Sequence, residues 1–114
     1  MIMLRLRMNV LPEKQKELRQ TLLSITDLTG NDRGCLGCNV FCDMEDNHIY
    51  TLIEEWETRE DMERHIRSER FSVLLGTKSL LAEPLEIQFH TVSRSEGMEV
   101  VNALRAQRNL LIKR

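Results

Sequence analysis

The chain opens with a regular alternation of apolar and other side chains. Apolar residues occupy every second position from Ile2 to Val10, and Arg5 and Arg7 lie between them. A repeat of two places successive side chains on opposite faces of a strand. We therefore predict a first strand that buries one of its faces.

A different spacing begins after Pro12. Apolar residues recur at intervals of four and three residues up to residue 29: Leu18, Leu22, Ile25 and Leu28. Such spacing is typical of an amphipathic helix, and proline is well suited to the first turn of one. We predict a helix over residues 12–29, ended by the glycine, Asn and Asp residues that follow it.

Two further strands are predicted over residues 36–42 and 48–56. The five residues between them, four of which are polar, are a length that suits a hairpin. Side chains on the second of these strands alternate between its faces. One face carries Tyr50, Leu52, Glu54 and Trp56.

A second helical region is predicted over residues 58–81, with a break near Ser68. Thr58 and Asp61 have the spacing of a helix N-cap, and Ser68 is a candidate second cap within the region. Phe71, Leu74 and Leu75 continue an apolar stripe after the break. We expect this region to pack on the sheet beside the first helix.

Pro84 begins a predicted fourth strand, with Leu85, Ile87 and Phe89 on one face. Because proline lacks a backbone N–H donor, this strand is expected at an edge of the sheet. A last helix is predicted after Gly97, and its apolar side chains require cover from a second subunit or from the mouth of a pocket.

The predicted order of elements is βαββαβ followed by a helix. This is the α+β, ferredoxin-like arrangement: a four-stranded antiparallel sheet with its helices on one face. We expect one domain over residues 1–92 and a helical extension over residues 93–114. The open sheet face would mix apolar and polar side chains, namely Met3, Arg5, Arg7, Ile49, Thr51, Ile53, Glu55 and Val92. A half-apolar face of this kind predicts a homodimer.

The composition narrows the class of protein. A chain of 114 residues with 41% hydrophobic side chains is the size of one globular domain. The 16 basic and 18 acidic residues nearly balance, which argues against a nucleic-acid partner. All uncharged stretches are short, so we expect no membrane span and a cytoplasmic protein.

Three cysteines, Cys35, Cys38 and Cys42, fall within eight residues. With His48 they could form a zinc site. However, Cys38 and Cys42 alternate as on one strand face, whereas Cys35 precedes the strand among glycines, so a single metal would require a bulge. We favour small buried side chains and expect no metal ligands here.

The candidate chemistry lies at the junction of the third strand and the second helical region. Glu54 stands beside Trp56 on one strand face, and His65 lies one helical turn after Asp61. If the helix folds back over the sheet, His65 approaches Glu54 and Trp56. Each has a purely structural alternative: Trp56 as a core residue, Glu54 as a hydrogen-bonded carboxyl, and His65 at a helix C-terminus.

The sequence also resembles a known family. After the helix start at Pro12, the segment over residues 34–71 reads GCLGCNVFCDMEDNHIYTLIEEWETREDMERHIRSERF, and the likeness covers roughly residues 2–92. The order and spacing of these residues resemble the antibiotic biosynthesis monooxygenase (ABM) domain family. The most specific positions are Gly34, Cys35, Glu54, Trp56, His65, Ser68 and Phe71.

The resemblance implies a dimeric α/β barrel, and some members of the family oxidise quinols or polycyclic phenols with molecular oxygen, without metal or flavin. On this analogy His65 and Glu54 would be catalytic, with His65 as proton acceptor and Glu54 orienting it or acting as the base. Trp56, Tyr50 and Leu52 would line the substrate cavity, and the Trp56 indole would donate a hydrogen bond.

This chain departs from the better-understood branches of the family. Leu52 replaces an asparagine of the anthrone-oxidising branch, and Leu74 and Leu75 occupy the region of a histidine in haem-degrading relatives. Three hypotheses follow: a cofactor-independent monooxygenase of a quinol-like or phenolic molecule, a non-catalytic dimeric small-molecule-binding module, or a proton-shifting isomerase.

Overall fold

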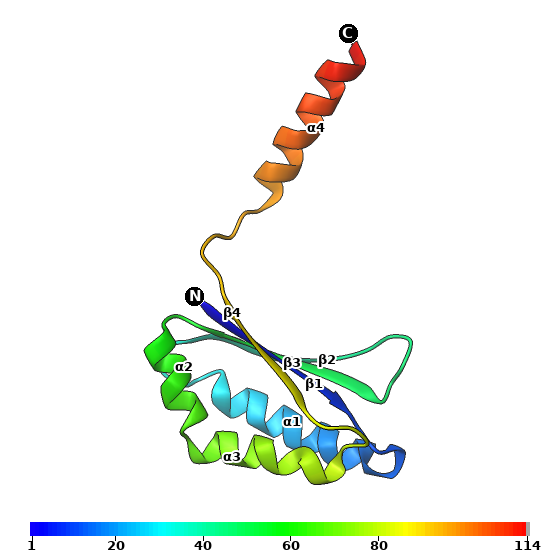
Figure 1. Cartoon of the computed structure of the whole chain (residues 1–114), viewed down its shortest axis with the longest axis vertical. Coiled ribbons are helices and arrows are strands. Elements are labelled where there is room, and N and C mark those ends of the chain that lie inside the picture. The colour runs from blue at the N-terminus through cyan, green and yellow to red at the C-terminus, as the bar shows by residue number, and fades with distance from the viewer. Residues whose placement is uncertain (114) are drawn as a thin grey trace.

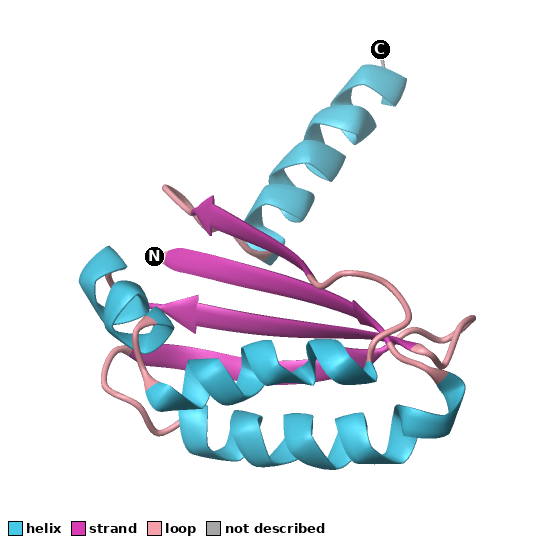
Figure 2. Ribbon diagram, turned by 60° about the horizontal axis from the view of Figure 1, so that its bottom comes forward, coloured by secondary structure: helices cyan, strands magenta, loops and turns pink. Residues whose placement is uncertain are grey.

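Four strands form one antiparallel sheet in the computed structural model, which describes residues 1–113. The strands stand in the order β2-β3-β1-β4, so β4 is an edge strand, as predicted from Pro84 (Figure 2). The bounds are β1 Ile2–Asn9, β2 Cys35–Cys42, β3 Ile49–Trp56 and β4 Glu86–Thr91.

The helices of the domain cover one face of this sheet (Figures 1 and 2). A short 3₁₀ turn, η1 Pro12–Lys14, leads into the first long helix, and the second helical region divides into three parts. The bounds are α1 Gln15–Thr29, α2 Arg59–Ile66, α3 Glu69–Gly76 and the 3₁₀ turn η2 Thr77–Leu80. The predicted ferredoxin-like βαββαβ fold is therefore confirmed.

The core lies between the helices and the sheet face that they cover. The inward side chains of β1 and α1, among them Leu4, Leu6, Leu18 and Leu22, are fully buried. Burying each leucine contributes roughly 1.5–3 kcal/mol, so the two periodic patterns in the sequence account for much of the driving force. Both patterns predict the burial correctly except at Leu28, which lies at the end of α1 and is 51% exposed.

Hydroxyl side chains begin the two short helices. The Thr58 hydroxyl accepts a hydrogen bond from the Asp61 backbone N–H at 3.1 Å, and the Ser68 hydroxyl accepts one from the Phe71 N–H at 3.3 Å. Each bond satisfies a backbone donor that a helix start leaves free. The second cap ends α2 and turns the chain into α3, as the sequence predicts.

The edge of the sheet is less well covered than predicted. Ile87 and Phe89 face the helices, yet 37% and 49% of their surface is exposed, because β4 extends beyond the helical layer. Leu75, predicted on the buried stripe, is 47% exposed. The expectation of full burial at these three positions is wrong for the single chain.

The cysteines also differ in part from the prediction. Cys42 is exposed and Cys35 and Cys38 are half-buried, since β2 forms the other edge of the sheet. Burial raises the pKa of the Cys38 thiol to about 12. Within residues 1–113, no group of three or more His, Cys, Asp or Glu side chains is arranged to hold a metal ion.

The last helix, α4 Met98–Lys113, begins after Gly97 as predicted. It projects away from the domain in Figure 1, and Val101 and Leu104 are 47% and 58% exposed. The expectation that α4 covers a pocket mouth of its own chain is therefore wrong, whereas packing across a dimer stays a prediction. None of the described helices combines the length and the apolar character needed to cross a membrane.

Candidate active site

Strand β3 ends with two buried side chains that contact each other. Glu54 and Trp56 project from the same face, and their exposed fractions are 0% and 1%. The indole Nε1–H of Trp56 donates a hydrogen bond of 3.1 Å to Oε1 of Glu54. One carboxyl oxygen is therefore engaged by the neighbouring tryptophan, and the indole N–H predicted for a substrate already has a protein acceptor.

His65 lies on the last turn of α2 and meets this pair. Its Nε2 lies 3.0 Å from Oε1 and 3.2 Å from Oε2 of Glu54. The imidazole stacks on the Trp56 ring at a centroid distance of 4.6 Å, and Phe71 contacts it edge-on at 5.4 Å. The predicted convergence of His65, Glu54 and Trp56 is confirmed, and it follows from the fold of α2 back over the sheet.

The other imidazole nitrogen of His65 is different. Nδ1 is buried and has no hydrogen-bond partner among the described residues. The nearest acid is Asp32, whose Oδ2 lies 3.9 Å away and pairs with the Arg70 guanidinium. A buried polar atom without a partner is unfavourable, and such atoms occur at functional positions.

Asp32 and Arg70 were not among the predicted site residues. Asp32 lies in the turn after α1. Aspartate is common in turns, so its presence there does not indicate a functional role. The two residues are 38 positions apart, and no local pattern in the sequence joins them. Their proximity to His65 becomes visible only when the α1–β2 turn and α3 are placed beside α2.

A surface depression of about 280 Å³ lies beside His65 and Trp56. Its lining is Asp32, Arg33, Trp56, Asp61, Arg64, His65 and Ser68. The Thr58 hydroxyl, followed by Arg64, lowers the pKa of the Asp61 carboxyl. The depression therefore has an aromatic floor at Trp56 and His65 and a rim of both charges.

The glycine turn before β2 supports the same region. Gly34 has φ +80, and a Cβ placed there would lie 2.2 Å from the Asp61 side chain. Only glycine combines this backbone conformation with so close an approach. Gly34 therefore allows the α1–β2 turn to pack on the start of α2.

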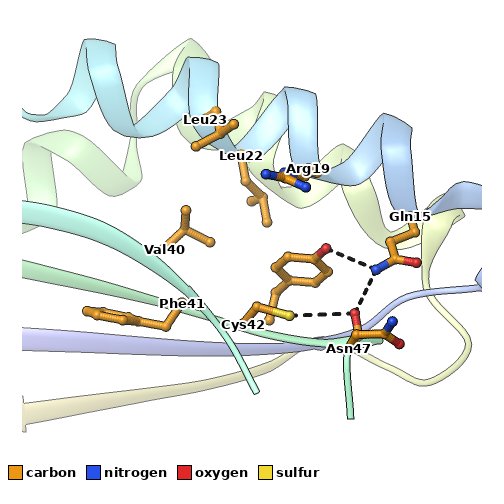
Figure 3. A pocket seen from close by; sticks show the side chains of 9 residues that line it. Gln15, Arg19, Leu22, Leu23, Val40, Phe41, Cys42 and Asn47 are labelled. Atoms are coloured by element: carbon orange, nitrogen blue, oxygen red, sulfur yellow. Dashed lines mark hydrogen bonds between the residues drawn. The ribbon is translucent and has the colours of Figure 1, made fainter. Parts of the chain in front are cut away.

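The other two predicted site residues lie elsewhere. Leu52 is fully buried in the core, and Tyr50 lines a separate cavity of about 450 Å³ between α1 and the β2–β3 hairpin (Figure 3). Tyr50 and Trp56 are six positions apart on β3, or about 20 Å. The expectation that all five residues line one cavity is wrong, because a strand of this length spans the whole domain.

The arrangement around His65 can move a proton. With a proton on Nε2 directed at Glu54, Nδ1 carries a lone pair that no described residue uses. The Glu54 carboxyl then fixes the ring orientation, and stacking on Trp56 restricts its rotation. A fixed imidazole beside a small concave surface is a common arrangement for general-base catalysis.

Comparison with known proteins supports the resemblance seen in the sequence. The family model for antibiotic biosynthesis monooxygenase matches residues 1–74. This match includes β1 to α3 up to Leu74, and hence Glu54, Trp56 and His65. None of the curated proteins compared with the chain matches it.

Solved structures share the fold. A conserved protein from Methanosarcina mazei is 28% identical, with 78% of this chain and 89% of that one covered at a TM-score of 0.73. A Deinococcus radiodurans protein described as a candidate antibiotic biosynthesis monooxygenase has a TM-score of 0.79 at 21% identity, with 85% and 97% covered. The protein Rv0793 from Mycobacterium tuberculosis has a TM-score of 0.77 at 16% identity, with 84% and 98% covered.

Proposed function

The chain belongs to the antibiotic biosynthesis monooxygenase family, and we propose that it oxidises a quinol-like or phenolic small molecule with molecular oxygen, without metal or flavin. One observation carries the proposal: a buried Glu54–His65 pair with an unpartnered imidazole nitrogen beside a surface depression. The roles of these residues are argued from their geometry and residue types.

In the proposed reaction, Nδ1 of His65 accepts the phenolic proton of the substrate. Deprotonation makes the ring electron-rich enough to reduce dioxygen, so the substrate itself supplies the electrons. A phenol with a free para carbon then gives a quinone and water. The para carbon loses its hydrogen atom and gains one oxygen atom of dioxygen. The other oxygen atom leaves as water, together with that hydrogen and the phenolic proton.

Glu54 is proposed to position His65 rather than to touch the substrate. Its carboxyl group has no exposed surface, and both oxygens lie within hydrogen-bond distance of His65 or Trp56. Holding the proton on Nε2 keeps Nδ1 ready as acceptor. The low polarity around the stacked rings strengthens this interaction, because little water competes for it.

The substrate would lie against the depression formed by Trp56 and His65. Nδ1 is buried, and Asp32, which pairs with Arg70, lies 3.9 Å from it, so a substrate hydroxyl reaches this nitrogen only if the Asp32 side chain moves aside. The indole N–H of Trp56 stays with Glu54, so it is not available to the substrate. The rim carries two arginines, Arg33 and Arg64, and two acids, Asp32 and Asp61, so its charges balance and it suits a neutral phenol.

We also propose that two copies associate through the open face of the sheet. Met3, Ile49 and Ile53 lie on this face and are half-buried, although the helices cover only the opposite side. A surface of mixed apolar and polar side chains is suited to a symmetric interface. Light scattering coupled to gel filtration measures the mass in solution, and a mass of one chain at high concentration would contradict this dimer.

The test of the activity is oxygen uptake with a panel of quinols and electron-rich phenols. We expect uptake by the wild-type chain and a loss of about 100-fold or more in His65→Gln, since general-base catalysis contributes 10²–10⁴-fold. The matched control is His48→Gln, which removes a partly exposed histidine from the β2–β3 hairpin. No uptake by the wild type, or equal uptake by His65→Gln, would remove the proposed mechanism.

The same panel separates the two alternatives. An isomerase using Glu54 and His65 would convert substrate at the same rate in the absence of oxygen. A binding module would bind a phenol without converting it, with or without oxygen. Following substrate by chromatography in aerobic and anaerobic samples therefore distinguishes all three.

A further inference from the structure

A second cavity of the described chain lies far from His65. It is bounded by α1 on one side and by the end of the β2–β3 hairpin on the other, and its volume is about 450 Å³ (Figure 3). Small-molecule sites have volumes of about 300–1,000 Å³. This cavity is therefore large enough for a compact organic ligand, and the proposed oxygenase chemistry does not use it.

The inner surface of the cavity is apolar. Leu22 is fully buried at its base and Val40 is half-buried beside it. At the rim, Leu23 is 50% exposed, whereas Phe41 pairs opposite Thr51 and its side chain lies on the other face of the sheet. A large apolar side chain that stays exposed beside a concave surface provides a place for the body of an apolar molecule.

Tyr50 supplies a fixed polar group within this apolar surface. The side chain is 6% exposed, and its hydroxyl accepts a hydrogen bond of 3.4 Å from Nε2 of Gln15. Gln15 also donates to the Asn47 carbonyl at 2.9 Å, which fixes the amide in place. The Tyr50 hydroxyl therefore lies near Gln15 of α1, and its hydrogen has no acceptor among the described residues.

Arg19 supplies a positive charge at the same cavity. It projects from α1 one turn after Gln15, and the described ion pairs do not include it. The lining contains no Asp or Glu. A guanidinium without a protein carboxylate, beside a free hydroxyl donor, is a suitable partner for a ligand carboxylate.

We propose that this cavity is a second binding site, separate from His65, for a small carboxylic acid with an apolar body. The carboxylate pairs with Arg19 and accepts the Tyr50 hydroxyl hydrogen, and the apolar body packs on Leu22 and Val40. The site does not depend on the proposed oxygenase activity. It lies at the opposite end of β3, about 20 Å from Trp56.

Calorimetric titration of the full chain with 2-naphthoate tests this site. We expect binding, and affinity lower by about tenfold or more for the neutral analogue 2-naphthamide and for the variant Arg19→Gln, because each removes one charge of the pair. Tyr50→Phe is expected to weaken binding about threefold through the loss of one hydrogen bond.

The matched control is Lys16→Gln, which removes an exposed cation from the same helix outside the cavity. It should bind 2-naphthoate like the wild type, and so should His65→Gln. Equal losses in Lys16→Gln and Arg19→Gln would show non-specific attraction and overturn the proposal. Loss of binding in His65→Gln would place the ligand at the other depression and overturn it as well.

Alkylation by iodoacetamide locates the ligand independently. The exposed Cys42 lines the cavity, whereas Cys38 lies outside its lining and keeps its proton because burial raises its pKa to about 12. Bound 2-naphthoate should slow the alkylation of Cys42 in the wild type and not in Arg19→Gln. No binding of 2-naphthoate or 2-naphthamide, or no protection of Cys42 at saturation, would exclude the site.

Discussion

Nε2 of His65 lies 3.0 and 3.2 Å from the two carboxyl oxygens of Glu54, although eleven residues separate them in sequence. The turn from β3 into α2 brings them together, since the Thr58 cap starts a helix that folds back over the strand. The histidine therefore has a hydrogen-bond partner at one ring nitrogen only. Its second nitrogen is left for other chemistry.

Replacing Glu54 by Gln should abolish turnover with little loss of stability. The glutamine oxygen can still accept from Trp56, but its NH₂ donates to Nε2 of His65 and moves the imidazole proton to Nδ1. By analogy with the wrong tautomer in serine-protease triads, we expect a loss of about 10²–10⁴-fold in turnover. Nitrogen-detected NMR of the His65 ring would report the tautomer.

A contrasting variant separates positioning from packing. Glu54→Ala leaves the Trp56 N–H and His65 Nε2 buried without acceptors, so it should destabilise the fold by roughly 2–4 kcal/mol. Urea denaturation measures this difference. If Glu54→Gln retained wild-type turnover with the tautomer changed, the positioning role would be wrong.

Gly34 and Gly76 should respond to alanine in opposite directions. Gly34→Ala places a Cβ 2.2 Å from Asp61 in a left-handed backbone conformation, so we expect a destabilisation of roughly 2–4 kcal/mol. Gly76 is the last residue of α3, and no heavy atom lies within 4 Å of the Cβ that alanine would add there. Alanine is more favourable than glycine in a helix by about 1 kcal/mol, so Gly76→Ala should stabilise the fold. Urea midpoints of the two variants should lie on opposite sides of the wild type.

The sequence predicted the fold well because its patterns are local. Alternation in β1, the three- and four-residue spacing in α1 and the Ser68 cap each depend on neighbours that are close along the chain. The burial of Ile87 and Phe89 could not be predicted in the same way, because it depends on how far the helical layer extends over the sheet edge.

The candidate site was predicted in part for the same reason. Glu54, Trp56 and His65 lie within one strand–helix unit, and their spacing indicated the contact. Arg70 reaches Asp32 from an element far along the chain, and Tyr50 proved to line another cavity. The direction of each side chain followed from the strand repeat, whereas the division into two cavities depends on where α1 and α2 lie.

The acid stability of the chain should depend on Asp61. Its pKa in the folded protein is lowered from 3.8 by the Thr58 hydroxyl and by Arg64. A lowered carboxyl pKa gives stability that is present above pH 3.8 and is lost as the pH falls through the folded-state value. Asp61→Asn should therefore lose stability at neutral pH and show a flatter stability profile below pH 3.8.

Thermal melts across this pH range measure the effect on α2. The matched control is Asp27→Asn, an exposed acid on α1 outside the depression. If Asp61→Asn and the wild type lost stability in parallel as the pH falls, the Asp61 cap would not contribute. Since Arg64, the partner of Asp61, is exposed to solvent, added salt should reduce the difference.

Removal of α4 should weaken association between copies. Val101 and Leu104 expose apolar surface on a helix that projects from its own domain, and a partner subunit can cover them (Figure 1). A chain truncated after residue 96 keeps the whole sheet and helices α1 to α3, so the domain should still fold. We expect a higher dissociation constant and a lower melting temperature at equal concentration, because association stabilises the folded chain.

Sedimentation of the truncated chain and of the double variant Val101→Ser, Leu104→Ser against the wild type measures this change in association. Unchanged association in both would exclude α4 from the interface, whereas loss in both would assign the contact to these apolar positions.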